Sequence, residues 1–145
     1  MLILFKIKIK KMKKLQFISL VISTILLFVN VEISKAGDLP DGIVNSLKTG
    51  NAKELAKHFN ANIDLTLIDK QEIYSKTQAE LILKEFFSKN VPSNFTIIHQ
   101  GEKEGSKYVI GNLTTSKGTF RVSLFLKSQD NTQVIHQLRI ESGNE

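Results

Sequence analysis

His136, His99 and Tyr74 are the residues of this sequence that we consider as candidates for acid–base chemistry. An imidazole changes its charge near neutral pH, and a general base must lie within hydrogen-bond reach of the proton that it removes. His136 alternates with Val134 and Leu138 along an expected strand, so we expect it on the apolar face of a sheet. There it is either a catalytic group in a cavity or a structural histidine bonded to backbone or water, the ordinary state of a lone buried histidine. The residue types therefore give candidates for catalysis, but their arrangement in the sequence does not predict a catalytic site.

The spacing of the remaining candidates predicts no metal site and no cofactor. The acidic residues that could join the histidines are Asp64, Asp69 and Glu72. However, no two histidines stand at the HxH or HxxxH spacing typical of a zinc site. The sequence has no GxGxxG, P-loop or GxSxG pattern and no cysteine.

The last third of the chain, Asn94–Glu141, predicts four strands joined by short turns. A two-residue loop at Lys117-Gly118 sorts the flanking side chains into one apolar and one polar face. A turn around Gln129–Asn131 extends the apolar face to the last strand and places His136 on it. The sequence therefore predicts a sheet with one core-like face.

The register of the first hairpin in this region stays open. His99 points inward if Phe95 and Ile97 do. It points outward if Thr96 and Ile98 point inward instead.

Residues 39–89 predict two short helices, a hairpin and a longer helix. Thr49-Gly50 ends the first helix, and Asn51 with Glu54 caps the second. A capping box at Thr77–Glu80 begins the longest helix, whose apolar residues recur at helical spacing. The expected order of elements is ααββαββββ, and the fold class is α+β.

Residues 1–36 have the features of a secretory signal peptide. A lysine-rich start precedes an apolar run at Leu15–Val31, and Ser34 and Ala36 are small residues at the positions that a signal peptidase requires. We expect cleavage after Ala36, export to the periplasm or the medium, and membrane contact only through this peptide during export. The alternative is an uncleaved anchor, although the apolar run is shorter than the ~20 residues of a spanning helix. Residues 37–145 are then a single mature domain.

The net charge of +6 belongs to this leader. Residues 37–145 hold 13 basic and 13 acidic residues, so the domain itself has no net charge. Nucleic-acid-binding domains carry a basic stripe on their folded part. The composition therefore predicts no nucleic-acid partner.

Four short segments of the sequence resemble those of a family of small exported bacterial proteins, known only as a domain of unknown function. This family is within the nuclear-transport-factor-2-like (cystatin-like) superfamily. The four segments are LKTGNAKELAKHF at Leu47–Phe59, QAELILKEFF at Gln78–Phe87, FTIIHQG at Phe95–Gly101, and FRV with QLRIE at Phe120–Val122 and Gln137–Glu141. The resemblance covers residues 37–145. It implies a cone-shaped domain in which three N-terminal helices pack on a strongly bent antiparallel sheet.

The resemblance also implies a cavity inside the cone, where enzymes of the superfamily use Asp, His or Tyr. The residues that we expect to line it are Leu83, Phe86, Val122, Leu124, His136 and Leu138. Members of the superfamily often dimerise through the opposite face of the sheet. There we expect an apolar interface of Ile110, Phe125 and Ile135.

The function expected from these observations is that of an exported, non-catalytic binding or interaction domain. Its partner is either a small apolar ligand in the cone or a protein on the sheet face, such as a second copy in a homodimer. The alternative is a cavity enzyme of the isomerase, dehydratase or cyclase type that uses His136 or His99 with Tyr74. Fold alone does not decide between these functions.

Overall fold

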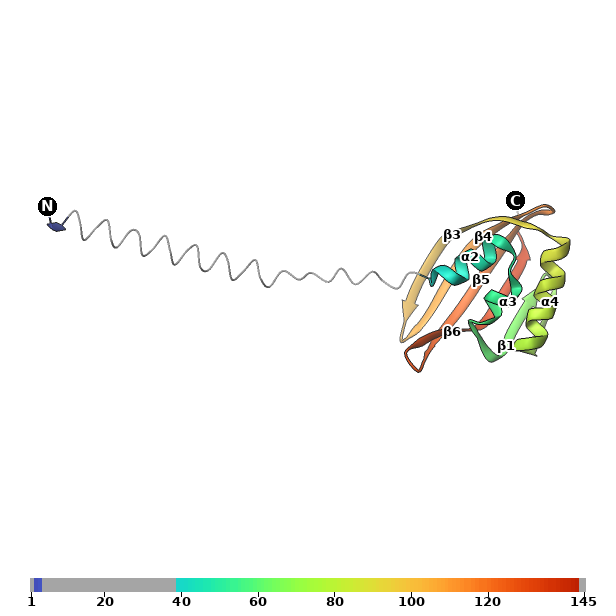
Figure 1. Cartoon of the computed structure of the whole chain (residues 1–145), viewed down its shortest axis with the longest axis horizontal. Helices are drawn as coiled ribbons and strands as arrows, with labels where there is room; N and C mark the ends of the chain where they lie inside the picture. Colours follow the sequence, from blue (N-terminus) through green and yellow to red (C-terminus); the bar gives the residue numbers. More distant parts are fainter. Residues whose placement is uncertain (1, 4–38, 144–145) are drawn as a thin grey trace. The chain divides into compact units, whose positions relative to one another are not determined.

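The computed structural model describes residues 2–3 and 39–143. The expected signal peptide is therefore outside the described residues, apart from two positions, as is its cleavage site after Ala36. None of the described helices is long and apolar enough to cross a membrane. From residue 39 the chain follows the predicted order of elements (Figure 1). They are α2 (Asp41–Thr49), α3 (Ala52–Ala56), β1 (Phe59–Leu67), β2 (Lys70–Ser75), α4 (Lys76–Lys89), β3 (Pro92–Lys103), β4 (Ser106–Thr115), β5 (Gly118–Gln129) and β6 (Thr132–Ser142).

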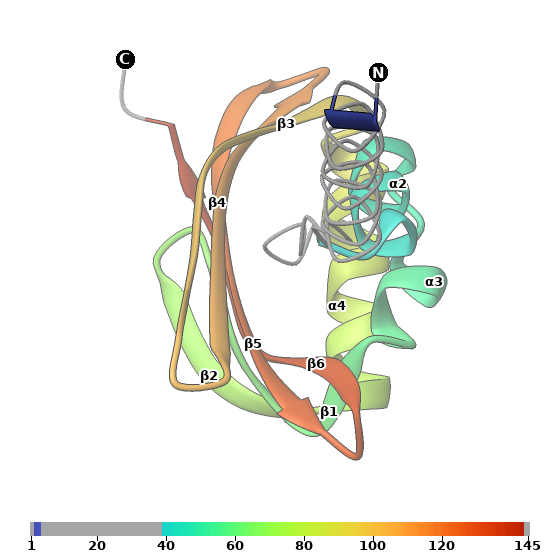
Figure 2. The same ribbon diagram turned by 90° about the vertical axis from the view of Figure 1, so that its left-hand side faces the viewer.

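The six strands form one open, mixed sheet in the order β2-β1-β6-β5-β4-β3. The α2, α3 and α4 helices lie on one face of this sheet, which curves around them (Figure 2). We call the opposite face the outer face. β1 runs parallel to β6, whereas the other neighbouring strands are antiparallel, so the prediction of a wholly antiparallel sheet is wrong at this pair. A parallel pair needs a long crossover, which β2, α4 and β3–β5 supply here.

The end of the first helix and the cap of the second lie where the sequence predicts. Gly50 ends α2 with a φ of 67°, a left-handed conformation that costs glycine little. The Asn51 side chain then accepts a hydrogen bond from the Glu54 backbone N–H and caps α3. α3 is shorter than its apolar spacing suggests, because it ends at Ala56 and Phe59 already begins β1.

The cap of α4 lies two residues before the predicted one. Ser75 is the N-cap residue, and its hydroxyl oxygen accepts a hydrogen bond from the Gln78 backbone N–H. The Gln78 side chain in turn accepts one from the Ser75 N–H. This capping box replaces the one predicted at Thr77–Glu80, since it is the residue at the end of β2 that turns the chain into the helix.

The hairpin between β4 and β5 turns one residue earlier than predicted. Thr115 pairs with Gly118, so the two-residue loop is Ser116-Lys117. Leu113 consequently lies opposite Phe120, two residues away from the predicted partner. A shift of two residues keeps every side chain on its face, which is why the sorting into an apolar and a polar face survives.

A β-bulge at His136 overturns the predicted placement of two residues. Leu126 pairs with Ile135 and Phe125 with Gln137, so His136 is the extra residue between the pairs. Ile135 therefore points into the core with 0% exposure, and not outward as predicted. His136 leaves the apolar face on which the uninterrupted alternation placed it.

A second bulge, at Ile98, resolves the open register of β3. Ile97 pairs with Gly111 and His99 with Ile110, which leaves Ile98 without a partner. Phe95 is buried and Ile97 packs against the core, yet His99 is on the outer face. Neither sequence alternative describes this arrangement, because each assumed an unbroken period of two.

The hydrophobic core fills the space between the helices and the sheet. The Phe86 ring packs edge-on against Phe87 and Phe120, with ring centroids 5.7 and 5.2 Å apart. The largest fully buried side chains are Ile43, Leu47, Leu55, Ile63, Leu65, Leu83, Leu113, Leu124, Leu126, Ile135, Leu138 and Ile140.

We expect Gly111→Ala to lower the free energy of unfolding by about 1–3 kcal/mol, the usual cost of overpacking a core. The added Cβ would lie 2.5 Å from the Phe95 ring and 2.7 Å from the Thr96 carbonyl oxygen. Urea unfolding followed by circular dichroism measures the loss. Asn112→Ala, at the exposed next position, is the control, and Phe95→Leu in the Gly111→Ala background should restore part of the loss. An unchanged midpoint for Gly111→Ala would contradict the tight contact.

Burial lowers the pKa of two histidines below their usual value. For His136, Lys127 adds to the effect of burial on the pKa and Asp64 opposes it. For His58, burial is again the largest cause of the lowered pKa. The unfolded chain, in which both side chains are solvated, therefore binds protons more readily than the folded chain.

We expect the protein to lose stability as the pH falls from 7.5 to 5.5. The pKa of His136 and of His58 is lowered in the folded state. Near the unperturbed histidine pKa of about 6.5, the unfolded state therefore binds more protons than the folded state does. His136→Gln and His58→Gln should each flatten this pH dependence, since glutamine does not titrate. Urea midpoints at the two pH values measure it. The assignment to His136 is wrong if its variant keeps the full slope.

Candidate functional site

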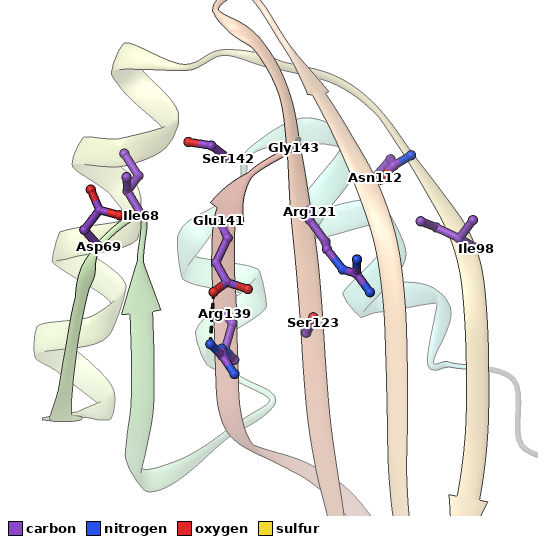
Figure 3. A pocket seen from close by; sticks show the side chains of 10 residues that line it. All are labelled: Ile68, Asp69, Ile98, Asn112, Arg121, Ser123, Arg139, Glu141, Ser142 and Gly143. Atoms are coloured by element: carbon purple, nitrogen blue, oxygen red, sulfur yellow. Dashed lines mark hydrogen bonds and ion pairs between the residues drawn. The ribbon is translucent and has the colours of Figure 1, made fainter. Parts of the chain in front are cut away.

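The outer face of the sheet carries a hollow of about 740 Å³ over its middle strands (Figure 3). We call it the polar hollow. Ten residues line it: Ile68, Asp69, Ile98, Asn112, Arg121, Ser123, Arg139, Glu141, Ser142 and Gly143.

Strand register brings the polar side chains of the hollow together. Arg121 on β5 lies opposite Asn112 on β4 and Glu141 on β6. Ser123, two residues along β5 and therefore on the same face, lies opposite Arg139. Ser123 is only 8% exposed, so its hydroxyl is at the floor of the hollow. Adjacent strands thus hold a compact set of hydrogen-bonding groups.

The two arginines of the hollow have different surroundings. Arg139 forms an ion pair with Glu141 at 2.9 Å. The ion pairs among the described residues leave Arg121 without a partner. Its guanidinium group points away from Glu141 toward β4 (Figure 3). Of the two arginines, Arg121 is therefore the one without an ion-pair partner in the described part of the chain.

Two buried polar atoms on neighbouring strands, one of them in a residue that lines the hollow, have no hydrogen-bond partner among the described residues. They are Nε of Arg139 and Oγ1 of Thr66, which lies opposite Arg139 on β1. Leaving a buried polar atom unpaired costs about 1–3 kcal/mol. Within the described part of the chain these two atoms are therefore unsatisfied, and neither is exposed to the hollow.

Aromatic and imidazole side chains gather at the other end of the outer face. Tyr108 donates to or accepts from His99 across a 3.0 Å hydrogen bond between its hydroxyl and Nε2. Its ring lies over Gly101, where a Cβ would come within 2.6 Å of it. Tyr108 and His136 also line a smaller hollow of about 370 Å³ with Phe125.

The three predicted catalytic candidates do not form one site. Tyr74, on the edge strand β2, hydrogen-bonds to the Glu72 carboxylate at 2.8 Å. His99 and His136 are both near Tyr108 on the outer face, outside the apolar interior. Nδ1 of His136 is buried without a partner among the described residues. Chemistry in the interior would therefore proceed without either histidine.

The residues expected to line a cone cavity are mostly core residues. All but His136 have exposures of 5% or less and line none of the hollows above: Leu83, Phe86, Val122, Leu124 and Leu138. Of the expected interface, Ile110 and Phe125 are half-buried on the outer face, whereas Ile135 is in the core.

Sequence reasoning missed Arg121 and Arg139 as site residues. A compositional signal was present, because eighteen of the twenty basic residues of the chain are lysines and these two are its only arginines. Arginine offers a planar fork of donors that lysine lacks. Their distance of eighteen residues in sequence hides that they lie on neighbouring strands.

A protein-family model described as "Domain of unknown function (DUF4783)" matches residues 40–141. No protein with a curated description matches the chain. Two crystal structures of DUF4783 family proteins are similar to it. The one from Bacteroides ovatus is 38% identical, with a TM-score of 0.71, over 74% of this chain and 97% of that chain. The one from Bacteroides fragilis is 35% identical, with a TM-score of 0.70, over 73% and 100%.

More distant structures share the fold alone. An NTF-2 like protein of unknown function from Shewanella oneidensis is 16% identical, with a TM-score of 0.55, over 70% of this chain and 91% of that chain. A domain with a cystatin-like fold from Nostoc punctiforme is 8% identical, with a TM-score of 0.59, over 72% and 73%. The resemblance seen in the sequence is thereby confirmed: the chain belongs to the DUF4783 family of domains of unknown function and has the NTF2-like, or cystatin-like, fold.

Proposed function

We propose that this protein is an exported, non-catalytic binding domain whose binding site is the polar hollow on the outer face. The observation that carries the proposal is Arg121, which has no ion-pair partner among the described residues and lines the hollow together with the nearly buried Ser123. A guanidinium group and a hydroxyl group in the lining of a hollow favour a polar molecule that accepts their hydrogen bonds. Export rests on the signal-peptide features of residues 1–36.

The packing of the interior favours the outer face over a ligand in the cone. Phe86 and Phe120 are in edge-to-face contact, and Leu83 and Leu124 have 0% exposure. A ligand inside would have to displace these side chains, which costs the contacts of a close-packed core. The small apolar ligand expected from the sequence would need such a rearrangement, whereas a polar ligand on the outer face would not.

The positions of the histidines favour binding over catalysis. A cavity enzyme needs a general base beside its substrate in a site that excludes water. His99 is on the outer face with its imidazole bonded to Tyr108, and its side chain is exposed. Tyr74 is engaged by Glu72 on a different edge of the sheet. The isomerase, dehydratase or cyclase alternative therefore has less support.

We expect the full chain, purified without detergent, to carry a non-covalent small-molecule adduct in native mass spectrometry that is lost on denaturation. Asn112→Trp should abolish the adduct, because an indole on this exposed residue fills the polar hollow. Leu81→Trp is the matched control, since Leu81 is exposed on α4, on the other side of the domain. Circular dichroism checks that both variants fold.

Two results would contradict this function. An adduct that persists in Asn112→Trp would place the ligand elsewhere in the molecule. A wild-type dimer without adduct, dissociated by Asn112→Trp, would mean that a second copy and not a small molecule occupies the outer face.

A further inference from the structure

The polar hollow contains both arginines of a chain whose other eighteen basic residues are lysines. A lysine would supply a positive charge equally well at an exposed strand position. Arginine differs in its planar guanidinium group, which presents paired N–H donors and matches a carboxylate or phosphate with two parallel hydrogen bonds. The residue type therefore favours an anionic ligand group over a neutral one.

Arg139 is already committed within the fold. Its guanidinium group pairs with Glu141 at 2.9 Å, and its Nε atom is buried. It neutralises the carboxylate that lies directly across the strands from Arg121. The guanidinium group of Arg121, turned toward β4, consequently faces the Asn112 side of the hollow (Figure 3). An anion at Arg121 would meet further donors there, in the Ser123 hydroxyl and the Asn112 amide.

Carboxylates occupy the opposite side of the same hollow. Asp69 and Glu141 lie across the hollow from the Arg121 guanidinium group (Figure 3). The four charged side chains of the lining sum to zero. This balance disfavours a doubly charged phosphate, which the carboxylates would repel. It suits a singly charged carboxylate whose other end carries hydrogen-bond donors, either hydroxyl groups or an amine.

We propose that the polar hollow binds a small carboxylic acid that also bears hydroxyl or amine groups, such as a sugar acid or an amino acid. This inference rests on the proposed binding function and specifies its ligand. The ligand carboxylate accepts hydrogen bonds from the Arg121 guanidinium group and from Ser123. Its hydroxyl or amine groups donate to Glu141 on the neighbouring strand β6, whereas Asp69, beyond β6, contributes only its negative charge. Ile98, which is 59% exposed, adds an apolar side chain to the lining on β3, on the far side of β4 from Arg121.

The test is a titration of the ¹⁵N-labelled full chain followed by NMR. The probes are galacturonate, L-serine, neutral galactose, acetate and inorganic phosphate. We expect galacturonate or serine to shift the amide signals around Asn112, Arg121 and Ser123, and galactose, acetate and phosphate to do so at least about tenfold more weakly. The stronger of galacturonate and serine distinguishes a sugar acid from an amino acid.

Charge variants identify the group that binds the carboxylate. Arg121→Gln should weaken the binding of the preferred probe about tenfold or more, the usual cost of losing a charge-assisted hydrogen bond. Lys84→Gln, which removes the same charge from exposed α4, should leave it unchanged. Arg121→Lys should restore only part of the affinity, because it restores the charge without the paired donors.

The outcomes separate this inference from the proposed function. Equal binding of galactose and galacturonate, tighter binding of phosphate, or equal affinities of Arg121→Gln and Lys84→Gln would each overturn the carboxylate assignment. So would the absence of shifts with every probe. In all these cases the adduct experiment with Asn112→Trp still decides whether the hollow is a binding site.

Discussion

The β-bulge at His136 is the constraint on which both faces of the sheet depend. β6 lies between β5 and β1, so its side chains must fit two neighbours at once. One extra residue allows Ile135 and Leu138 both to point into the core. Without it, an isoleucine would face water and an imidazole would enter an apolar interior, and both changes cost free energy. The bulge therefore keeps the inner face apolar.

The packed inner face makes the outer face a rigid platform. Phe86, Phe120 and the buried leucines join the helices to the sheet, so the strands cannot slide past one another without breaking that packing. The relative positions of Arg121 and Arg139 are then set by backbone pairing between β5 and β6. A site on paired strands is more precisely positioned than one on loops. This division leaves the core to stabilise the domain and the outer face for the ligand that we propose.

The candidate site illustrates why a binding surface on a sheet has no sequence motif. Its lining residues come from β3, β4, β5, β6 and the turn after β1, so no pair of neighbouring elements contains all of them. Arg121 lacks an ion-pair partner among the described residues because Arg139 pairs with Glu141, an arrangement that spacing along the chain does not reveal. The histidines attract attention in the sequence, but His99 is hydrogen-bonded to Tyr108 and His136 is the extra residue of a β-bulge.

The sequence by itself determined the order of elements, the left-handed end of α2 at Gly50, the cap at Asn51 and the inward direction of Leu138. These features depend on local energetics, namely helix caps, positive φ and the alternation of apolar residues. Only the tertiary structure decided the bulges at Ile98 and His136 and the parallel pairing of β1 with β6. A period of two cannot show where an extra residue interrupts it, because that position follows from the fit between strands distant in sequence. The polar hollow exists only once that fit is made.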